Sequence, residues 1–144
     1  MQSQLALLCI TPTQEQLASQ PYNPHIDMSA ERGQRFVTVY VNPIASHEML
    51  SAKKPHFPKG SLIIKEKMLT ATSPTPELLT VMRKREKGFN PAGGDWEYFV
   101  LDGTGKRVQS QGRLAACMSC HATWKDTDYV SRAYLDAHVR DKLR

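Results

Sequence analysis

The sequence predicts an α+β fold: a mainly antiparallel, five-stranded β-sheet with short helices, one of them near the C-terminus. Five runs of β-favouring residues follow one another with short connections, which is typical of an antiparallel meander. Clusters of turn-forming residues separate the runs, above all at 88–95 and at 102–105. After the last run, Arg113–Thr123 has helical character.

Each strand is predicted from its own pattern of side chains. The expected strands are Arg35–Asn42, Ser61–Thr70, Glu77–Arg85, Trp96–Leu101 and Lys106–Gln111. The first is the clearest, because valines occupy every second position and so share one face. Pro43 ends it, since proline cannot donate to a β ladder.

Short helices are expected beside the sheet. Capping and breaking residues place them at Thr13–Ser19, at Ser46–Lys53 with Ser46 as N-cap, and at Asp126–Leu135 with an acidic cap. We therefore divide the chain into an N-terminal helix and loop extension, 1–34, and a main domain, 35–144, which together form one globular unit.

Composition excludes several classes of protein. A chain of 144 residues with 40% hydrophobic residues is long enough to bury a core. No run approaches the roughly 20 apolar residues of a membrane span. The net charge of +5 comes from dispersed basic residues, without the aromatic and basic interleaving of nucleic-acid modules. This charge suits solvated surface, or docking of an acidic redox partner.

The chemistry of the chain is concentrated in the run Cys117-Met118-Ser119-Cys120-His121. Cys-x-x-Cys-His is the attachment motif of c-type haem: the cysteines form thioethers and the histidine ligates iron. The spacing puts all three side chains on one helical face. Two alternatives remain open, a thiol–disulfide redox pair and half of a structural zinc site. Cys9, the third cysteine, is expected to be a small buried apolar residue.

The position of the motif favours an iron with an open coordination site. No methionine follows it, and the only later histidine is His138, in a tail expected to be exposed. A sixth protein ligand would have to come from upstream; the candidates are Met28, Met49, Met68, Met82, His25, His47 and His56. Each is more simply a core or surface residue. An open iron binds or transforms small ligands, whereas one closed on both sides mainly carries electrons.

Further stretches between about residues 35 and 135 resemble a known family in their order and spacing. They are Phe36–Pro43, Phe57–Ser61, Ile64–Lys67, Leu79–Met82, Gly88–Pro91, Gly94–Tyr98 and Cys117–His121 leading into Asp128–Val130. Together they resemble the cytochrome P-460 family, which includes hydroxylamine-oxidising enzymes and gas-binding cytochromes c′-beta. The resemblance implies a β-rich fold, one covalent haem c, proximal ligation by His121 and a homodimer.

The two branches of that family differ on the distal side of the haem. P-460 enzymes bond a strand lysine covalently to a porphyrin meso carbon. The resemblance matches that lysine to Lys65, with Lys67 as second choice; the alternative is an ordinary surface lysine. Cytochromes c′-beta instead crowd the iron with phenylalanines, for which the candidates are Phe36, Phe57 and Phe99.

The expected function is therefore binding or oxidation of small nitrogen-oxide ligands, with electron transfer through an upstream sixth ligand as the alternative. Whether the protein is a hydroxylamine-oxidising enzyme or a non-catalytic binder of NO or CO stays open. Candidate proton acceptors are Glu66, Glu97 and Asp95, and candidate propionate partners are Arg83 and Arg113. Covalent haem attachment in bacteria predicts a periplasmic protein, although no export signal is evident in this sequence.

Overall fold

The computed structural model describes residues 6–9, 36–68, 75–132, 135 and 137–144. Six antiparallel strands form one sheet in chain order. They are β1 (Ala6–Cys9), β2 (Phe36–Val41), β3 (Leu62–Met68), β4 (Leu78–Lys84), β5 (Trp96–Asp102) and β6 (Val108–Gly112). The helices are α2 (Pro43–Leu50), η3 (Pro91–Gly93), α3 (Ala115–His121), η4 (Ala122–Thr127) and α4 (Ala137–Lys142). None of the described helices is long and apolar enough to cross a membrane.

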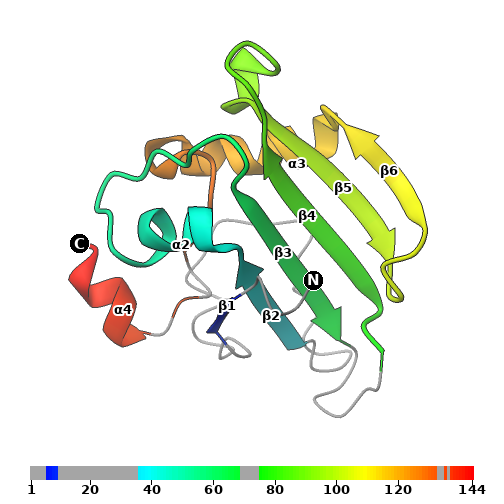
Figure 1. The fold of residues 1–144 in the computed structure, drawn as a ribbon, viewed down its shortest axis with the longest axis horizontal. Coiled ribbons are helices and arrows are strands. Elements are labelled where there is room, and N and C mark those ends of the chain that lie inside the picture. Colours follow the sequence, from blue (N-terminus) through cyan, green and yellow to red (C-terminus); the bar gives the residue numbers. More distant parts are fainter. Residues whose placement is uncertain (1–5, 10–35, 69–74, 133–134, 136) are drawn as a thin grey trace.

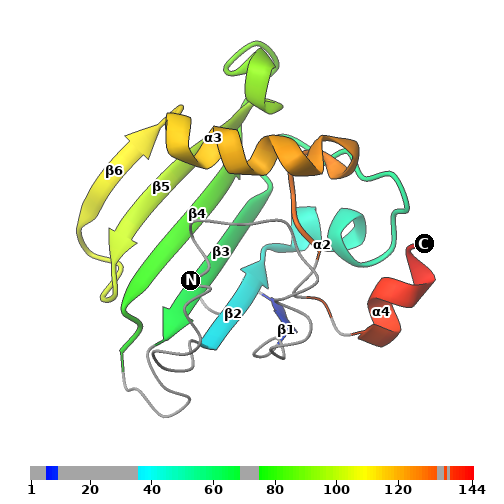
Figure 2. The same ribbon diagram turned by 180° about the vertical axis from the view of Figure 1, so that it is seen from behind.

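The helix α3 lies across one face of the sheet, toward the viewer in Figure 2 and behind the strands in Figure 1. Strand register places one row of apolar side chains beneath it: Val41, Ile63, Met82 and Tyr98. All four belong to the hydrophobic core, together with Met49 of α2. The core therefore sits between this face of the sheet and the helices α2 and α3.

The predicted α+β fold with a mainly antiparallel sheet is confirmed. Each of the five predicted strands is present, with ends that differ by at most two residues. The strand β1 was not predicted; it pairs with β2, with an irregularity between Leu7 and Cys9. The predicted helix Thr13–Ser19 lies outside the described residues.

The helix after β2 begins earlier than the sequence suggested. Its N-cap is Asn42, not Ser46, because the Asn42 side-chain oxygen accepts a hydrogen bond from the Ala45 N–H at 3.3 Å. Pro43 ends the strand as expected, but it is also the first residue of the helix. Proline suits that position because its fixed φ is helical and its missing N–H would have no partner there.

The prediction of a helix over Asp126–Leu135 is wrong. The 3₁₀ helix η4 follows α3 directly, and the chain then turns through Asp128 and Tyr129, whose φ angles are +55° and +66°. Two consecutive left-handed residues cannot continue a right-handed helix. The last helix is α4, which lies beyond this turn.

Candidate functional site

The helix α3 presents the Cys-x-x-Cys-His motif to the sheet. Cys117 and Cys120 are 5% and 8% exposed, so both thiols point into the protein. His121, the last residue of the helix, lies beside them and is partly buried. The three side chains share one face of α3, as the spacing predicted.

A cavity separates this helical face from the sheet. It encloses about 580 Å³ that no protein atom fills, part of which is open to solvent. Its lining includes Cys117 and His121 from α3, Lys65 from β3 and Tyr98 from β5. Most other lining residues are apolar, which suits a large, flat, hydrophobic group.

The ring of His121 is oriented by a backbone carbonyl. Its Nδ1 lies 2.7 Å from the carbonyl oxygen of Tyr129. Because a carbonyl can only accept, Nδ1 must carry the proton and donate it. In the neutral ring the lone pair is then on Nε2, the nitrogen that is able to ligate iron. The rings of Tyr98 and Trp124 flank the imidazole, with centroids 5.3 Å and 5.4 Å away.

The thiols have the properties of buried cysteines rather than of activated ones. Cys117 and Cys120 are not joined to each other by a disulfide. Burial raises the pKa of each thiol, although nearby Lys65 opposes this rise. Redox-active thiols have lowered pKa values, so the thiol–disulfide alternative loses support. Within the described part of the chain, no three His, Cys, Asp or Glu side chains are grouped so that they could hold a metal ion.

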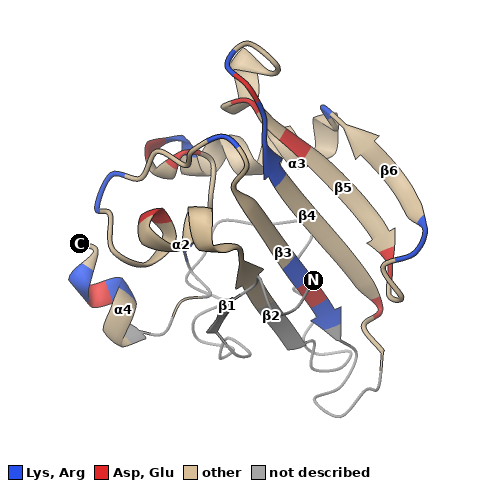
Figure 3. Cartoon of the chain, viewed as in Figure 1, with Lys and Arg blue, Asp and Glu red and all other residues tan. Residues whose placement is uncertain are grey.

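Lys65 lines the same cavity as Cys117. It belongs to a basic–acidic–basic run in β3, an otherwise uncharged strand (Figure 3). Its neighbours in the sheet are Val39 and Thr80, both of which also line the cavity. Burial, reinforced by repulsion from Lys67, lowers the pKa of Lys65 from 10.5 to about 8, while the two cysteines act in the opposite direction. A desolvated amine of this kind is a stronger nucleophile at neutral pH than an ordinary lysine.

Tyr98 brings a polar atom to the cavity that has no partner within the described residues. The residue is 3% exposed, and its buried hydroxyl makes no hydrogen bond there. Burial raises the pKa of this phenol, so it stays protonated and able to donate. Buried hydroxyls are normally satisfied. An acceptor on a bound group, such as a carboxylate, would satisfy it, so the cavity fits a cofactor that is apolar in its body and polar at its edge.

Some of the other predicted site residues line the cavity and others do not. Three candidates line it: Met49, Met82 and Phe99. His47, His56 and Phe57 do not line it; Phe57 packs against Trp96 instead, with ring centroids 5.6 Å apart. His138 is exposed, as expected. Met28 and His25, and the side chains of Cys9, Phe36 and Met68, lie outside the described residues.

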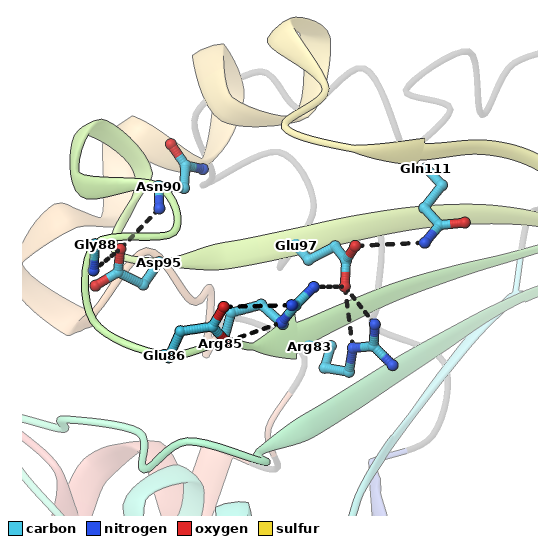
Figure 4. Close-up of polar contacts among 8 residues, drawn as sticks. All are labelled: Arg83, Arg85, Glu86, Gly88, Asn90, Asp95, Glu97 and Gln111. Atoms are coloured by element: carbon cyan, nitrogen blue, oxygen red, sulfur yellow. Dashed lines mark hydrogen bonds and ion pairs between the residues drawn. The ribbon is translucent and has the colours of Figure 1, made fainter.

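The candidate bases and propionate partners do not line the cavity. Glu97 lies on the opposite face of β5 from Tyr98 and accepts hydrogen bonds from Arg83, Arg85 and Gln111 (Figure 4). Burial alone would raise the pKa of Glu97, but these bonds outweigh it and lower the pKa.

The remaining candidates make contacts elsewhere in the fold; they are Asp95, Glu66 and Arg113. Asp95 accepts two backbone N–H bonds in the 88–95 turn, which Figure 4 also shows. Glu66 interacts with the Tyr40 hydroxyl on the far face of the sheet. Arg113 lies over the ring of Phe89, 5.5 Å from its centroid.

Sequence reasoning missed two parts of the site. Tyr98 could have been found, because it alternates with Trp96 and Val100 along one predicted strand. The carbonyl of Tyr129 could not, since a backbone acceptor has no residue type that marks it.

Comparison with known proteins agrees with this geometry. The family model described as Cytochrome P460 matches residues 14–132, which is most of the chain. A search of curated proteins finds no significant match. The chain belongs to the cytochrome P460 family, and this membership makes it a c-type haem protein.

Proposed function

We propose that the chain carries one haem c, attached through Cys117 and Cys120 and ligated by His121, whose open distal side binds or oxidises small nitrogen-oxide ligands. One observation carries the proposal. One cavity is bounded both by the attachment motif on α3 and by a lysine of lowered pKa on β3. The predicted residues from two distant parts of the sequence thus meet at one site.

The residues of the cavity have separate tasks in this proposal. The two cysteines retain the cofactor covalently, independent of the strength of axial ligation. His121 supplies Nε2 to the iron while the Tyr129 carbonyl holds its ring. The haem, when bound, supplies a redox-active iron that accepts small ligands. Apolar lining residues such as Ile63 keep bulk water away.

The presence or absence of a bond between Lys65 and the porphyrin distinguishes the two branches of the family. With a pKa of about 8, roughly a tenth of the amine is unprotonated at pH 7. This supports the bond between lysine and porphyrin that characterises P-460 enzymes, and hence hydroxylamine oxidation. Without that bond, the same site is a pocket for NO or CO. The lowered pKa leads us to favour the cross-linked enzyme.

A second function has one observation in its favour. The thioether side chains of Met49 and Met82 both line the cavity and are 1% and 8% exposed. Either sulfur could become a sixth iron ligand. The protein would then be an electron-transfer cytochrome that binds no external ligand.

The deciding experiment is spectroscopic and uses protein matured with the cytochrome c assembly machinery. Absorption spectra are recorded with and without reductant and NO, and digested protein is mapped by mass spectrometry. We expect haem on the Cys117–Cys120 peptide, high-spin iron, NO binding, and a haem-bridged peptide containing Lys65. Loss of the bridge in Lys65→Met but not in Lys67→Met would assign it. A low-spin spectrum indifferent to NO would instead establish the electron-transfer function.

The cellular location and the assembly of the protein are further parts of the same proposal. Covalent attachment of haem in bacteria takes place outside the cytoplasmic membrane, so we place the mature protein in the periplasm. By analogy with the family, we expect the 35–144 domain to form a homodimer and to exchange electrons with a redox partner. Fractionation of cells and light scattering of the purified protein test these two expectations.

A further inference from the structure

The turn that follows η4 joins the candidate iron ligand to a charged pair outside the cavity. Asp128 and Tyr129 both have positive φ angles, which non-glycine residues adopt rarely. The Tyr129 N–H donates to the Trp124 carbonyl at 2.8 Å, and its own carbonyl accepts from His121. The position of that carbonyl therefore depends on an unusual backbone conformation that something else must hold.

Contacts to Asp128 hold this conformation. The Lys84 ammonium donates to both carboxylate oxygens at 2.9 Å, and the Phe57 N–H donates to one of them at 2.8 Å. The Trp96 indole N–H donates to the Asp128 carbonyl at 2.8 Å. Three separate segments of the chain thus fix one residue.

Shielding from water strengthens the charged pair. The side chains of Lys84 and Asp128 are only 14% and 11% exposed, and the Lys84 ammonium lies 5.0 Å from the centroid of the Trp96 ring. Ion pairs in such surroundings are screened less than exposed pairs. By contrast, Arg83 on the same strand is 46% exposed and pairs with Glu97 on the other face of the sheet.

We propose that Asp128 and Lys84 are positioning residues for the iron ligand. They hold the Tyr129 carbonyl against Nδ1 of His121, and so set how strongly His121 donates electrons to the haem iron. A firm hydrogen bond from Nδ1–H makes the imidazole a more basic ligand, which favours ferric iron. The inference rests on the proposed function, in which His121 is the proximal ligand of haem c.

The test compares haem-loaded variants by resonance Raman spectroscopy of the ferrous protein and by redox titration. Asp128→Asn keeps the shape of the side chain and tolerates positive φ, but loses the charge. Lys84→Met keeps the carboxylate and an apolar stem over Trp96. In both we expect a lower iron–imidazole stretching frequency and a higher midpoint potential than in the wild type. Lys84→Arg, which preserves the pair, should restore the wild-type values.

Arg83→Met is the matched control, because it also removes a cation of β4 from an ion pair. It should lower the thermal stability without moving the Raman band or the potential. Asp128→Asn and Lys84→Met proteins with wild-type frequency and potential would overturn the inference while leaving the proposed function intact. A wild-type protein that attaches no haem, or shows no iron–imidazole band, would overturn both.

Discussion

At the scale of single residues, the site is defined by polar groups whose burial is costly unless a cofactor is present. Lys65 is desolvated against two thiols, and the Tyr98 hydroxyl makes no hydrogen bond within the described residues. Desolvation of the Lys65 amine and the unpartnered Tyr98 hydroxyl both cost stability, because burying a charged group or an unsatisfied hydroxyl destabilises a fold. Each of them gives a measurable prediction for the haem-free protein.

Replacing Lys65 by methionine should change how stability depends on pH. Between pH 8 and 10.5 the unfolded chain keeps a proton on Lys65 that the folded chain has lost, so this residue makes the free energy of unfolding rise with pH. We expect haem-free Lys65→Met to have a higher free energy of unfolding than the haem-free wild type at pH 7. This difference between the two proteins should shrink by about 3 kcal/mol toward pH 10.5. Urea unfolding at several pH values measures it.

Lys67→Met controls for the loss of a cation from the same strand. This variant leaves Lys65 in the cavity. Its free energy of unfolding should therefore still rise with pH by most of the amount seen in the wild type. An advantage of Lys65→Met that stays constant with pH would show that the Lys65 amine is not desolvated.

Replacing Tyr98 by phenylalanine should stabilise the haem-free protein. The change removes a buried hydroxyl without a partner, a gain of about 1 kcal/mol. Tyr40→Phe is the control, because the Tyr40 hydroxyl interacts with Glu66 and its removal should destabilise. Chemical denaturation of both variants gives the comparison. Equal destabilisation by the two changes would mean that the Tyr98 hydroxyl is satisfied.

At the scale of elements, the turns contribute more than the strands to positioning the groups around His121. The 88–95 turn brings Gly94 against the Tyr129 ring, and the turn at Asp128 brings a carbonyl against His121. The strands were predictable because alternation of side chains marks them. The turn after η4 was not, because its left-handed residues are held by contacts from Lys84, Phe57 and Trp96, all distant in sequence.

Gly94→Ala should damage this junction more than Gly88→Ala. Both glycines have positive φ angles, of +71° and +96°, so both substitutions carry backbone strain of about 1 kcal/mol. An alanine Cβ at Gly94 would lie 2.5 Å from the Tyr129 ring, whereas at Gly88 it meets nothing within 4 Å. We expect the loss of unfolding free energy to be larger at Gly94 by about 1–3 kcal/mol. Similar losses at the two sites would rule out the close packing.

At the scale of the whole molecule, the sheet and α3 form two walls with a space between them. A cavity between the sheet and α3 removes packing contacts that the fold would otherwise gain. Attachment of haem should therefore stabilise the whole domain. We expect the haem-loaded protein to unfold at least several degrees above the haem-free protein in thermal scans followed by circular dichroism. In a variant with both motif cysteines replaced by serine, matured in the same way, this difference should be lost.

The sequence by itself determined the elements and the chemistry of the motif. Alternating side chains and turn residues specify five of the strands, and the spacing of Cys117, Cys120 and His121 specifies one helical face. These features are local, so neighbouring residues suffice to fix them. The placement of Lys65 and Tyr98 opposite the motif depends in addition on the strand register, which sets both residues on the face of the sheet that α3 covers.

Only the tertiary structure decided how the site is completed. It closed a cavity around Lys65 and Tyr98, directed Glu97 to the opposite face, and supplied the carbonyl that orients His121. The physical reason is that burial, pKa and backbone hydrogen bonds depend on groups far apart in the chain. A carbonyl is the same in every residue, so its role becomes visible only when the fold places it beside its donor.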